Sequence, residues 1–391
     1  MITATTAKDV ASHQVEQYSK KLIDISHSIH DHPELGFQER YAAELLEATL
    51  TENGFTVEEG CCGIPTAFRA RMGQGKVAFA VCAEYDALPE VGHACGHNII
   101  AATAVGTGIA LAPLLDELDI ELLIIGTPAE EGGGGKITML DRGGFAGVSA
   151  AMMVHPWSSA TDRTDFTCLA VSNFEVVFSG KQAHASANPE EGINAGDALC
   201  IAQVAIGLLR QHLRPGEQVH GIVTNGGEAP NIIPGHASGH FMIRARTIEE
   251  LTNLEIRIHR CFEAGAVATG SQLEIAKLSP NYSQFKVDEE MARVYRANAE
   301  ALGRVFDDDP TTAPSFSTDM ANVSLALPSI HPLMGISSLP ALNHQPGFTE
   351  ASSSKLADKA VLDGAKAMAW TIIDLSLDPE WRVSHALRDQ E

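Results

Sequence analysis

The stretch of the chain from Ala83 to His97, AEYDALPEVGHACGH, concentrates side chains that can bind a metal ion. Behind an apolar run it includes Glu84, Asp86, His93, Cys95 and His97. Thiolate, imidazole and carboxylate groups are the ligands of a borderline cation such as Zn²⁺. Taken alone, the stretch predicts a metal-binding loop.

Further groups of the same chemistry follow at long range: the adjacent acids Glu130 and Glu131, His155 in MMVHP, and His344 in LNHQPGF. A pair of acids is often a solvated turn, but here a strand-like run precedes the pair and four glycines follow it, so the backbone can bend sharply. One carboxylate could then bind metal while the other takes a proton from metal-bound water. The pKa of such water falls to about 7, and a second metal about 3.5–4 Å away would hold the other side of the reacting group.

Two other kinds of site are less consistent with these residues. The segment EEGGGGKIT resembles a phosphate-binding loop, but Glu130 and Ile137 occupy positions where that motif requires glycine and Ser or Thr. Cys95 and His97 could be a nucleophile and its base, yet residues two apart do not readily turn their side chains toward each other. His331 is left unassigned.

The elements that must position these groups alternate in type. Apolar strands are predicted within residues 75–87, 120–128 and 150–156, with helices around 98–111 and from Lys136 onward. This alternation predicts an α/β fold whose mostly parallel sheet is flanked by helices. The candidate acids and His155 follow the strands, so we expect them at the carboxyl edge of the sheet, where ligands bind.

The pattern changes after about Val171 to a βαββαβ order, which predicts an inserted domain with an antiparallel sheet. We expect residues 173–285 to form this insert, and residues 1–172 and 286–391 to form the domain that holds the metal-binding residues. The insert contains His184, Asn231 and Arg244. An imidazole could stabilise an oxyanion and an Arg fork could bind a carboxylate, although a surface histidine and a salt bridge are the simpler interpretations.

Composition narrows the possible partners. The 391 residues carry a formal net charge of -23, which argues against nucleic acid or an anionic membrane. Residues 98–115 are uncharged, but Ala, Gly and Thr dominate and Pro113 interrupts them, so a buried helix is expected. No secretory signal is visible at the N-terminus, and the seven scattered cysteines do not suggest a disulfide framework. A cytoplasmic location is therefore expected.

The motifs together resemble the M20 metallopeptidases, specifically the amidohydrolase branch, subfamily D. The resemblance covers nearly the whole chain, through HDHPELGFQE, AEYDALPEVGHACGHN, GTPAEEGGGGK, MMVHP, GKQAHASANPEEGINAGDA, NIIPGHASGHFMIRA, STDMANVS and LNHQPGF. Within this branch, the sequences of these motifs are similar to those of a subgroup that includes a dipeptidase-like member, which acts on β-alanyl and related dipeptides. It is similar also to aminobenzoyl-glutamate hydrolase subunits.

The resemblance implies that residues 173–285 are a lid or dimerisation domain and that residues 1–172 and 286–391 are the catalytic domain. It also implies a role for each candidate residue. Glu130 would be the general base and Asp86 a carboxylate that orients a ligand, while the metal ligands would be Cys95, His97, Glu131, His155 and His344. His184 would act in the partner subunit's active site, with Asn231 and Arg244 contacting substrate. Asn98 stands where many relatives have Asp, Glu84 stands where other branches have a ligand histidine, and Asp319 would line the site.

The sequence therefore predicts a cytoplasmic, homodimeric amidohydrolase with two divalent metal ions per subunit. Zinc is expected, with manganese or cobalt as alternatives. Metal-activated water and Glu130 would cleave the amide of an N-acyl amino acid or related conjugate. A dipeptidase acting on β-alanyl or similar dipeptides is the alternative, and a non-catalytic metal-binding or ligand-binding dimer is a more distant one.

Overall fold

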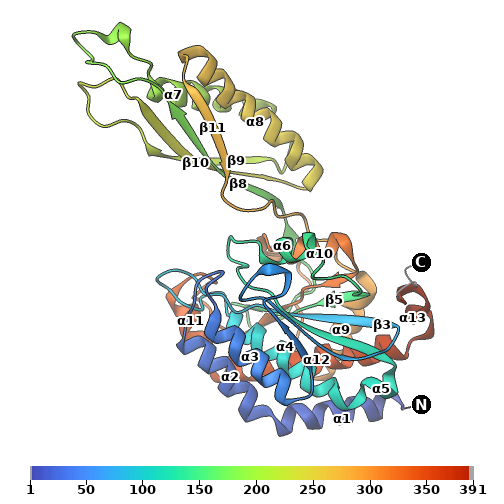
Figure 1. Cartoon of the computed structure of the whole chain (residues 1–391). Helices are drawn as coiled ribbons and strands as arrows, with labels where there is room; N and C mark the ends of the chain where they lie inside the picture. Colours follow the sequence, from blue (N-terminus) through green and yellow to red (C-terminus); the bar gives the residue numbers. More distant parts are fainter. Residues whose placement is uncertain (1, 387–391) are drawn as a thin grey trace. The chain divides into compact units, whose positions relative to one another are not determined.

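The computed structural model describes residues 2–386, which form two compact units (Figure 1). The first unit comprises the chain up to Thr167, Phe285–Pro314 and the described residues from Asp319 onward. The second unit comprises Cys168–Gln284 and Ser315–Thr318. It is thus an insertion in the first, beginning before residue 173 and including a short later segment. The two-residue strands β7 (Thr167–Cys168) and β12 (Ser315–Phe316) lie where the chain passes between the units.

The first unit contains a six-stranded sheet in the order β1-β2-β4-β3-β5-β13. The pairs β4–β3, β3–β5 and β5–β13 are parallel, whereas β1–β2 and β2–β4 are antiparallel. The predicted α/β class is confirmed. The strands are β1 (Thr56–Glu59), β2 (Phe68–Gly73), β3 (Val77–Ala83), β4 (Ile120–Gly126), β5 (Ala150–Met152) and β13 (Ser329–Ile330).

Helices cover both faces of this sheet (Figure 1). Along β3, Phe79 and Val81 join a core with α1, α4 and α12, while Ala80 and Cys82 join a second core with α6 and α10. Side chains of a strand alternate between faces, so a strand covered on both sides must be apolar throughout. The helices are α1 (Ala4–Gln17), α2 (Ser19–Asp31), α3 (Arg40–Glu52), α4 (His97–Leu111), α5 (Leu115–Leu118), α6 (Gly135–Asp141), α9 (Glu289–Ala301), α10 (Met320–Ala326), α11 (Pro346–Ala351), α12 (Lys355–Leu377) and α13 (Pro379–His385).

Helix α4 is buried along its whole length, as the uncharged run after His97 predicted. Gly106 allows α12 to approach closely, because a Cβ atom there would lie 2.8 Å from the Cβ of Ala365. Within the described residues, the stretch His97–Leu118 has the length and apolar composition to cross a membrane, but 89% of its 18-residue apolar window is buried inside the fold. Such burial is typical of a core helix.

The carboxyl ends of three parallel strands bring the candidate residues to one edge of the sheet. Glu84 follows β3, Glu130 lies in the turn after β4, and His155 follows β5. The predicted third strand is divided into β5 and β6 (His155–Trp157), which pairs with β14 (Leu333–Gly335). The division arises because the pairing with β3 ends at Met152, after which the chain follows the C-terminal segment: the His155 N–H donates to Pro332 O at 2.9 Å.

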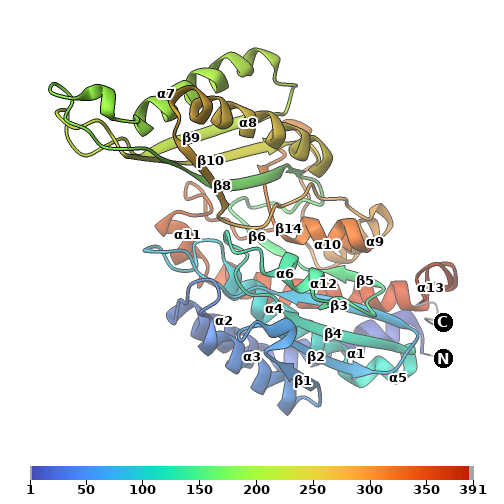
Figure 2. The same ribbon diagram turned by 45° about the horizontal axis from the view of Figure 1, so that its top comes forward.

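The second unit has the predicted βαββαβ order and an antiparallel sheet, β11-β8-β10-β9. Helices α7 and α8 pack on one face of this sheet (Figure 2), over a core that includes Phe174, Phe178 and Phe262. Strand β9 lies at one edge. The elements are β8 (Ala170–Ser179), α7 (Ala195–Leu209), β9 (Gln218–Asn225), β10 (His236–Ala245), α8 (Ile248–Thr269) and β11 (Gln272–Lys277).

Candidate metal centre

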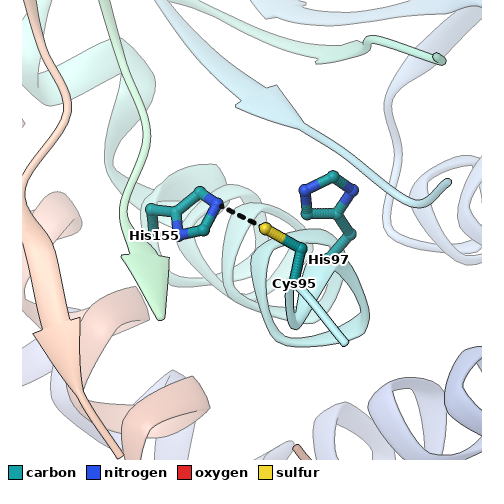
Figure 3. Close-up of side chains that lie close together, drawn as sticks. All are labelled: Cys95, His97 and His155. Atoms are coloured by element: carbon teal, nitrogen blue, oxygen red, sulfur yellow. Dashed lines mark hydrogen bonds between the residues drawn. The ribbon is translucent and has the colours of Figure 1, made fainter. Parts of the chain in front are cut away.

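Three predicted ligands meet at the carboxyl edge of the first unit's sheet. Cys95 Sγ lies 3.4 Å from His155 Nε2, and the sulfur points toward this imidazole (Figure 3). One ligand atom each from Cys95, His97 and His155 lies within 4.8 Å of the others. A single cation can therefore contact all three side chains.

The other two predicted ligands join this cluster. Glu131 and His344 form a second group with Cys95, and Glu130 and Glu131 form a third group with His97. His344 Nε2 lies 3.2 Å from Glu131 Oε1. The structure thus brings together the five side chains that the resemblance implied as ligands, and it places Glu130 beside them.

Backbone turns hold the ligands in these positions. Gly96 has a φ of 76°, and a Cβ atom there would lie 2.5 Å from Pro156 Cγ, so this turn requires glycine. It separates Cys95 from His97, the first residue of α4, and both side chains can face the cluster. The backbone N–H of His344 donates to Ala94 O at 2.8 Å, which ties the C-terminal loop to the same turn.

Asp86 connects two ligand-bearing segments. Its Oδ1 lies 2.9 Å from His97 Nδ1, and its Oδ2 accepts a hydrogen bond of 2.9 Å from the Glu131 N–H. Burial disfavours charge on His97, but the carboxylate of Asp86 outweighs it and raises the pKa of His97 well above its ordinary value. A carboxylate at Nδ1 fixes the tautomer that presents Nε2 to a metal.

His155 is oriented in a similar way by the backbone. Its Nδ1 lies 2.8 Å from the carbonyl oxygen of Pro156, so a proton on Nδ1 leaves Nε2 as the atom that could bind a metal. Burial lowers the pKa of His155 to about 4, which favours the neutral imidazole that metals bind. His331 stacks on this ring, with the ring centroids 5.3 Å apart.

The donor set fits a divalent metal. His97 Nε2 and Glu84 Oε2 are buried, lie 3.5 Å apart and have no hydrogen-bond partner among the described residues. Buried polar atoms of this kind normally have a partner, and a cation would supply one for His97. A cysteine sulfur, three imidazoles and a carboxylate suit Zn²⁺ and related ions.

Glu130 is 7% exposed and lies among other acids. One oxygen each from Glu84, Glu130 and Asp319 falls within 4.8 Å of the others. Burial, together with the charges of Glu84, Glu131 and Asp319, raises the pKa of Glu130 well above its ordinary value. A carboxyl group with a raised pKa can both accept and return a proton near neutral pH.

The cation that accompanies these acids is Lys136, for which no role was predicted. Lys136 is fully buried, its Nζ donates to Glu84 and to Asp319 Oδ1 (2.7 Å), and its backbone N–H donates to Asp319 Oδ2 at 2.8 Å. Glu84 and Asp319 therefore have a common partner. A lysine directly after four glycines, at the start of an apolar helix, was the available signal.

Glu39 also lacked an assigned role. It is buried, and its Oε1 accepts a hydrogen bond of 2.8 Å from the N–H of Ala129. Ala129 has a φ of 56° and directly precedes Glu130 and Glu131, so Glu39 holds the turn that presents both acids. Burial raises the pKa of Glu39 to about 7, and the negative charge of Asp86 acts in the same direction.

The remaining candidates lie in the second unit. His184 is exposed, and its Nδ1 accepts from the backbone N–H groups of Ser186 and Ala187, both at 3.3 Å. This arrangement places the proton of a neutral ring on Nε2. The Asn231 carbonyl accepts from the N–H of Ala185 at 3.0 Å, so Asn231 lies in the neighbouring loop.

Arg244 lies apart from these loops, on β10. It is partly buried, and its guanidinium donates to Ser317 Oγ at 3.1 Å. Burial lowers its pKa from the ordinary value. Within the second unit, His184 and Asn231 are thus neighbours, and Arg244 is a separate group.

Comparisons with known proteins identify relatives of this chain. The M20 peptidase dimerisation domain matches residues 171–269. The chain is 35% identical to Xaa-Arg dipeptidase from Mus musculus, over 94% of this chain and 89% of that protein. It is 33% identical to a p-aminobenzoyl-glutamate hydrolase subunit from Escherichia coli, over 66% of this chain and 58% of that protein. The chain is also similar to the crystal structure of Bacillus subtilis YxeP, which is described as a dinuclear metal-binding peptidase of the M20 family. The TM-score is 0.70 and the sequence identity is 23%, over 92% of this chain and 99% of that chain.

Proposed function

The chain belongs to the M20 family of peptidases, and on that premise we propose that it hydrolyses the amide bond of N-acyl amino acids or dipeptides and releases a free amino acid. The observation that carries this proposal is the convergence of a cysteine, three histidines and Glu131 beside the buried Glu130. A protein that only bound metal would not require a buried carboxyl group with a raised pKa next to the ligands.

Cys95, His97, Glu131, His155 and His344 would hold two divalent ions. Such ions supply Lewis acidity toward the amide carbonyl and lower the pKa of bound water to about 7. Zinc fits this set best because it includes a cysteine, and manganese and cobalt are the alternatives.

Glu130 would act as general base and then as general acid. It would accept a proton from the attacking water and deliver it to the leaving amine, a use of one carboxyl group that requires a pKa close to the working pH. Asp86 would not touch the substrate, since both its oxygens already hold His97 and the backbone of Glu131. Its function would be to fix their orientation.

The second unit would supply substrate contacts. In the neutral tautomer set by Ser186 and Ala187, the Nε2–H of His184 is available to donate to the oxyanion that forms at the amide carbon. Arg244 would bind the substrate carboxylate, since a guanidinium offers two parallel donors. Asn231 would donate from its side-chain amide.

We expect the enzyme to be a homodimer. The second unit matches a dimerisation domain, and its edge strand β9 exposes Ile222 (64%) and Val223 (45%). The nearby helix α7 exposes Val204 and Leu208. An exposed apolar edge strand pairs readily with another strand, so a second copy would add its β9 here, and His184 would act in the partner's active site. A cytoplasmic location fits the seven free cysteines.

A dipeptide that ends in arginine is a more specific candidate substrate. Xaa-Arg dipeptidase is the name of a relative that matches nearly the whole chain. The net charge of -23 would also attract a cationic substrate.

The test is a panel of N-acyl amino acids, Xaa-Arg and β-alanyl dipeptides and aryl-glutamate conjugates, assayed with Zn²⁺, Mn²⁺ or Co²⁺ and after chelation. We expect hydrolysis of at least one class that chelation abolishes and metal restores. Full activity in a verified metal-free sample would contradict the metal requirement. Metal binding without hydrolysis of any class would favour a binding dimer.

A further inference from the structure

The motif HPELGFQE forms a loop between α2 and α3 that exposes two large apolar side chains beside the metal centre. Leu35 is 40% and Phe37 is 46% exposed. Both line a cavity of about 170 Å³ whose wall also includes Ala87, Pro89, Ala129 and Glu131. The cavity therefore borders directly on one of the proposed metal ligands.

Hydrogen bonds fix this loop to the rest of the first unit. The carboxylate of Glu34 accepts from the N–H groups of Tyr41 (3.0 Å) and Ala42 (3.1 Å), and the Glu34 carbonyl accepts from the Ala87 N–H at 2.8 Å. Glu39, at the other end of the loop, holds Ala129. The exposure of Leu35 and Phe37 is thus imposed by a loop anchored at several points.

Phe37 occupies an unfavourable backbone conformation. Its φ is 63°, a region in which a bulky residue costs on the order of 1–3 kcal/mol. Its ring lies against the glycine-rich turn, since a Cβ atom on Gly133 would lie 2.9 Å from Phe37 Cε2. The fold therefore maintains an exposed aromatic wall at this point despite its cost, and exposed apolar surface next to a reactive centre indicates ligand contact.

We propose that this cavity binds the apolar group on the carbonyl side of the scissile amide, which is the acyl chain or the side chain of the N-terminal residue. The inference rests on the proposed function. The cavity adjoins Glu131, so a carbonyl held at the metal centre would have its acyl chain next to the opening. Its lining residues include no cation that could pair with a carboxylate, whereas Arg244 is the group proposed for that purpose. This leaves the acyl half of the substrate as the occupant.

The volume of the cavity indicates which acyl groups it can bind. An apolar cavity of roughly 150 Å³ accepts benzene, so this one suits a phenyl ring or a chain of four to six carbons. Each buried methylene is worth about fourfold in affinity. Acyl chains of this length should therefore be preferred over acetyl by at least tenfold in kcat/KM.

The experiment compares N-hexanoyl and N-acetyl derivatives of the same amino acid. Leu35→Asp places a charge in the cavity and should reduce the hexanoyl-to-acetyl ratio of kcat/KM at least tenfold. Leu356→Asp is the matched control, because Leu356 is 50% exposed on α12 and does not line the cavity; its ratio should equal the wild-type value. Ala87→Leu fills the cavity and should lower the hexanoyl-to-acetyl ratio in the same way. If Ala87→Leu does not fold, Leu35→Asp decides the question by itself.

A binding measurement separates this inference from the proposed function. Calorimetry of the metal-loaded protein should show hexanoate binding at least tenfold more tightly than acetate, with the difference lost in Leu35→Asp. If no amide is hydrolysed but this difference remains, the proposed function is wrong and the cavity assignment stands. Equal affinities for the two carboxylates, or an unchanged ratio in Leu35→Asp, would overturn the assignment.

Discussion

Lys136 Nζ lies 2.7 Å from Asp319 Oδ1, although 183 residues separate the two in the chain. Both side chains are fully buried, and Lys136 also binds Glu84. Taking a charge out of water is costly unless a partner compensates it, so each member of this group depends on the others. The interaction joins α6, which follows the glycine-rich turn, to the start of α10.

Removal of the lysine charge should therefore destabilise the fold. Lys136→Met would leave buried carboxylates without their cation, and we expect the free energy of unfolding to fall by about 3–5 kcal/mol in urea denaturation. Adding Glu84→Gln and Asp319→Asn to this variant should restore much of the loss. If the triple variant is no more stable than Lys136→Met, the unpaired carboxylate charges are not the cause of the lost stability.

The strands and most helices were predictable because their patterns are local. The apolar run of β3 and the uncharged run of α4 each show burial without reference to the rest of the chain. The candidate ligands were predictable as well, since cysteine and histidine next to acids at strand ends suggest metal binding by their chemistry.

The network around Glu130 was not predictable in this way. The resemblance implied only that Asp319 lines the site, and the position of Lys136 after four glycines did not indicate its partners. The fold shows that both residues are buried and bonded to each other. The same holds for Glu39, whose hydrogen bond to Ala129 spans ninety residues. Nothing local in the sequence marks a contact at such a separation.

Glu39 should make stability depend on pH. Its pKa of about 7 in the folded protein lies above the value near 4.3 of an unfolded chain. The folded state thus binds this proton more tightly, and the stabilisation is fully present below about pH 4 and lost as pH rises through about 7.

Glu39→Gln keeps the hydrogen bond to Ala129 and removes the titration. Relative to wild type, it should gain stability between pH 5 and pH 8, by about 1–3 kcal/mol in urea denaturation. Glu290→Gln, at an exposed position on α9, should show no such trend. If the difference in the free energy of unfolding between Glu39→Gln and wild type stays constant across this range, the pKa of Glu39 is not raised.

Substitutions of the adjacent acids Glu130 and Glu131 should have different effects, one on catalysis and the other on metal binding. Glu130→Gln removes the proposed general base, so turnover should fall on the order of 10²–10⁴-fold while metal content, measured by mass spectrometry of the metal, is retained. Glu131→Gln should instead lose metal affinity. The reverse pattern would mean that their roles are exchanged.

Arg244 should determine recognition of the substrate carboxylate. Arg244→Ala should raise KM for substrates with a free carboxylate by at least tenfold, because a charge-assisted pair of hydrogen bonds is lost. The corresponding carboxamides should be affected much less. Equal losses for acids and amides would assign Arg244 a structural role instead.

The final prediction concerns the dimer, in which we propose that His184 of one subunit serves the metal centre of the other. Glu130→Gln and His184→Ala should each be nearly inactive alone. In a mixed dimer, one active site collects both defects, while the other combines a normal Glu130 with a normal His184. Random re-assortment of equal amounts makes about half of the dimers mixed, which restores roughly a quarter of wild-type activity.

Mass spectrometry of the intact dimers must establish that subunits have re-assorted. A mixture of Glu130→Gln with Glu130→Gln, His184→Ala is the matched control, because no dimer in it contains a normal Glu130, and it should stay inactive. If the test mixture re-assorts and remains as inactive as its components, His184 acts within its own subunit or has no catalytic role. Recovery near one quarter requires each functional site to draw on two chains, since neither variant alone contains both residues.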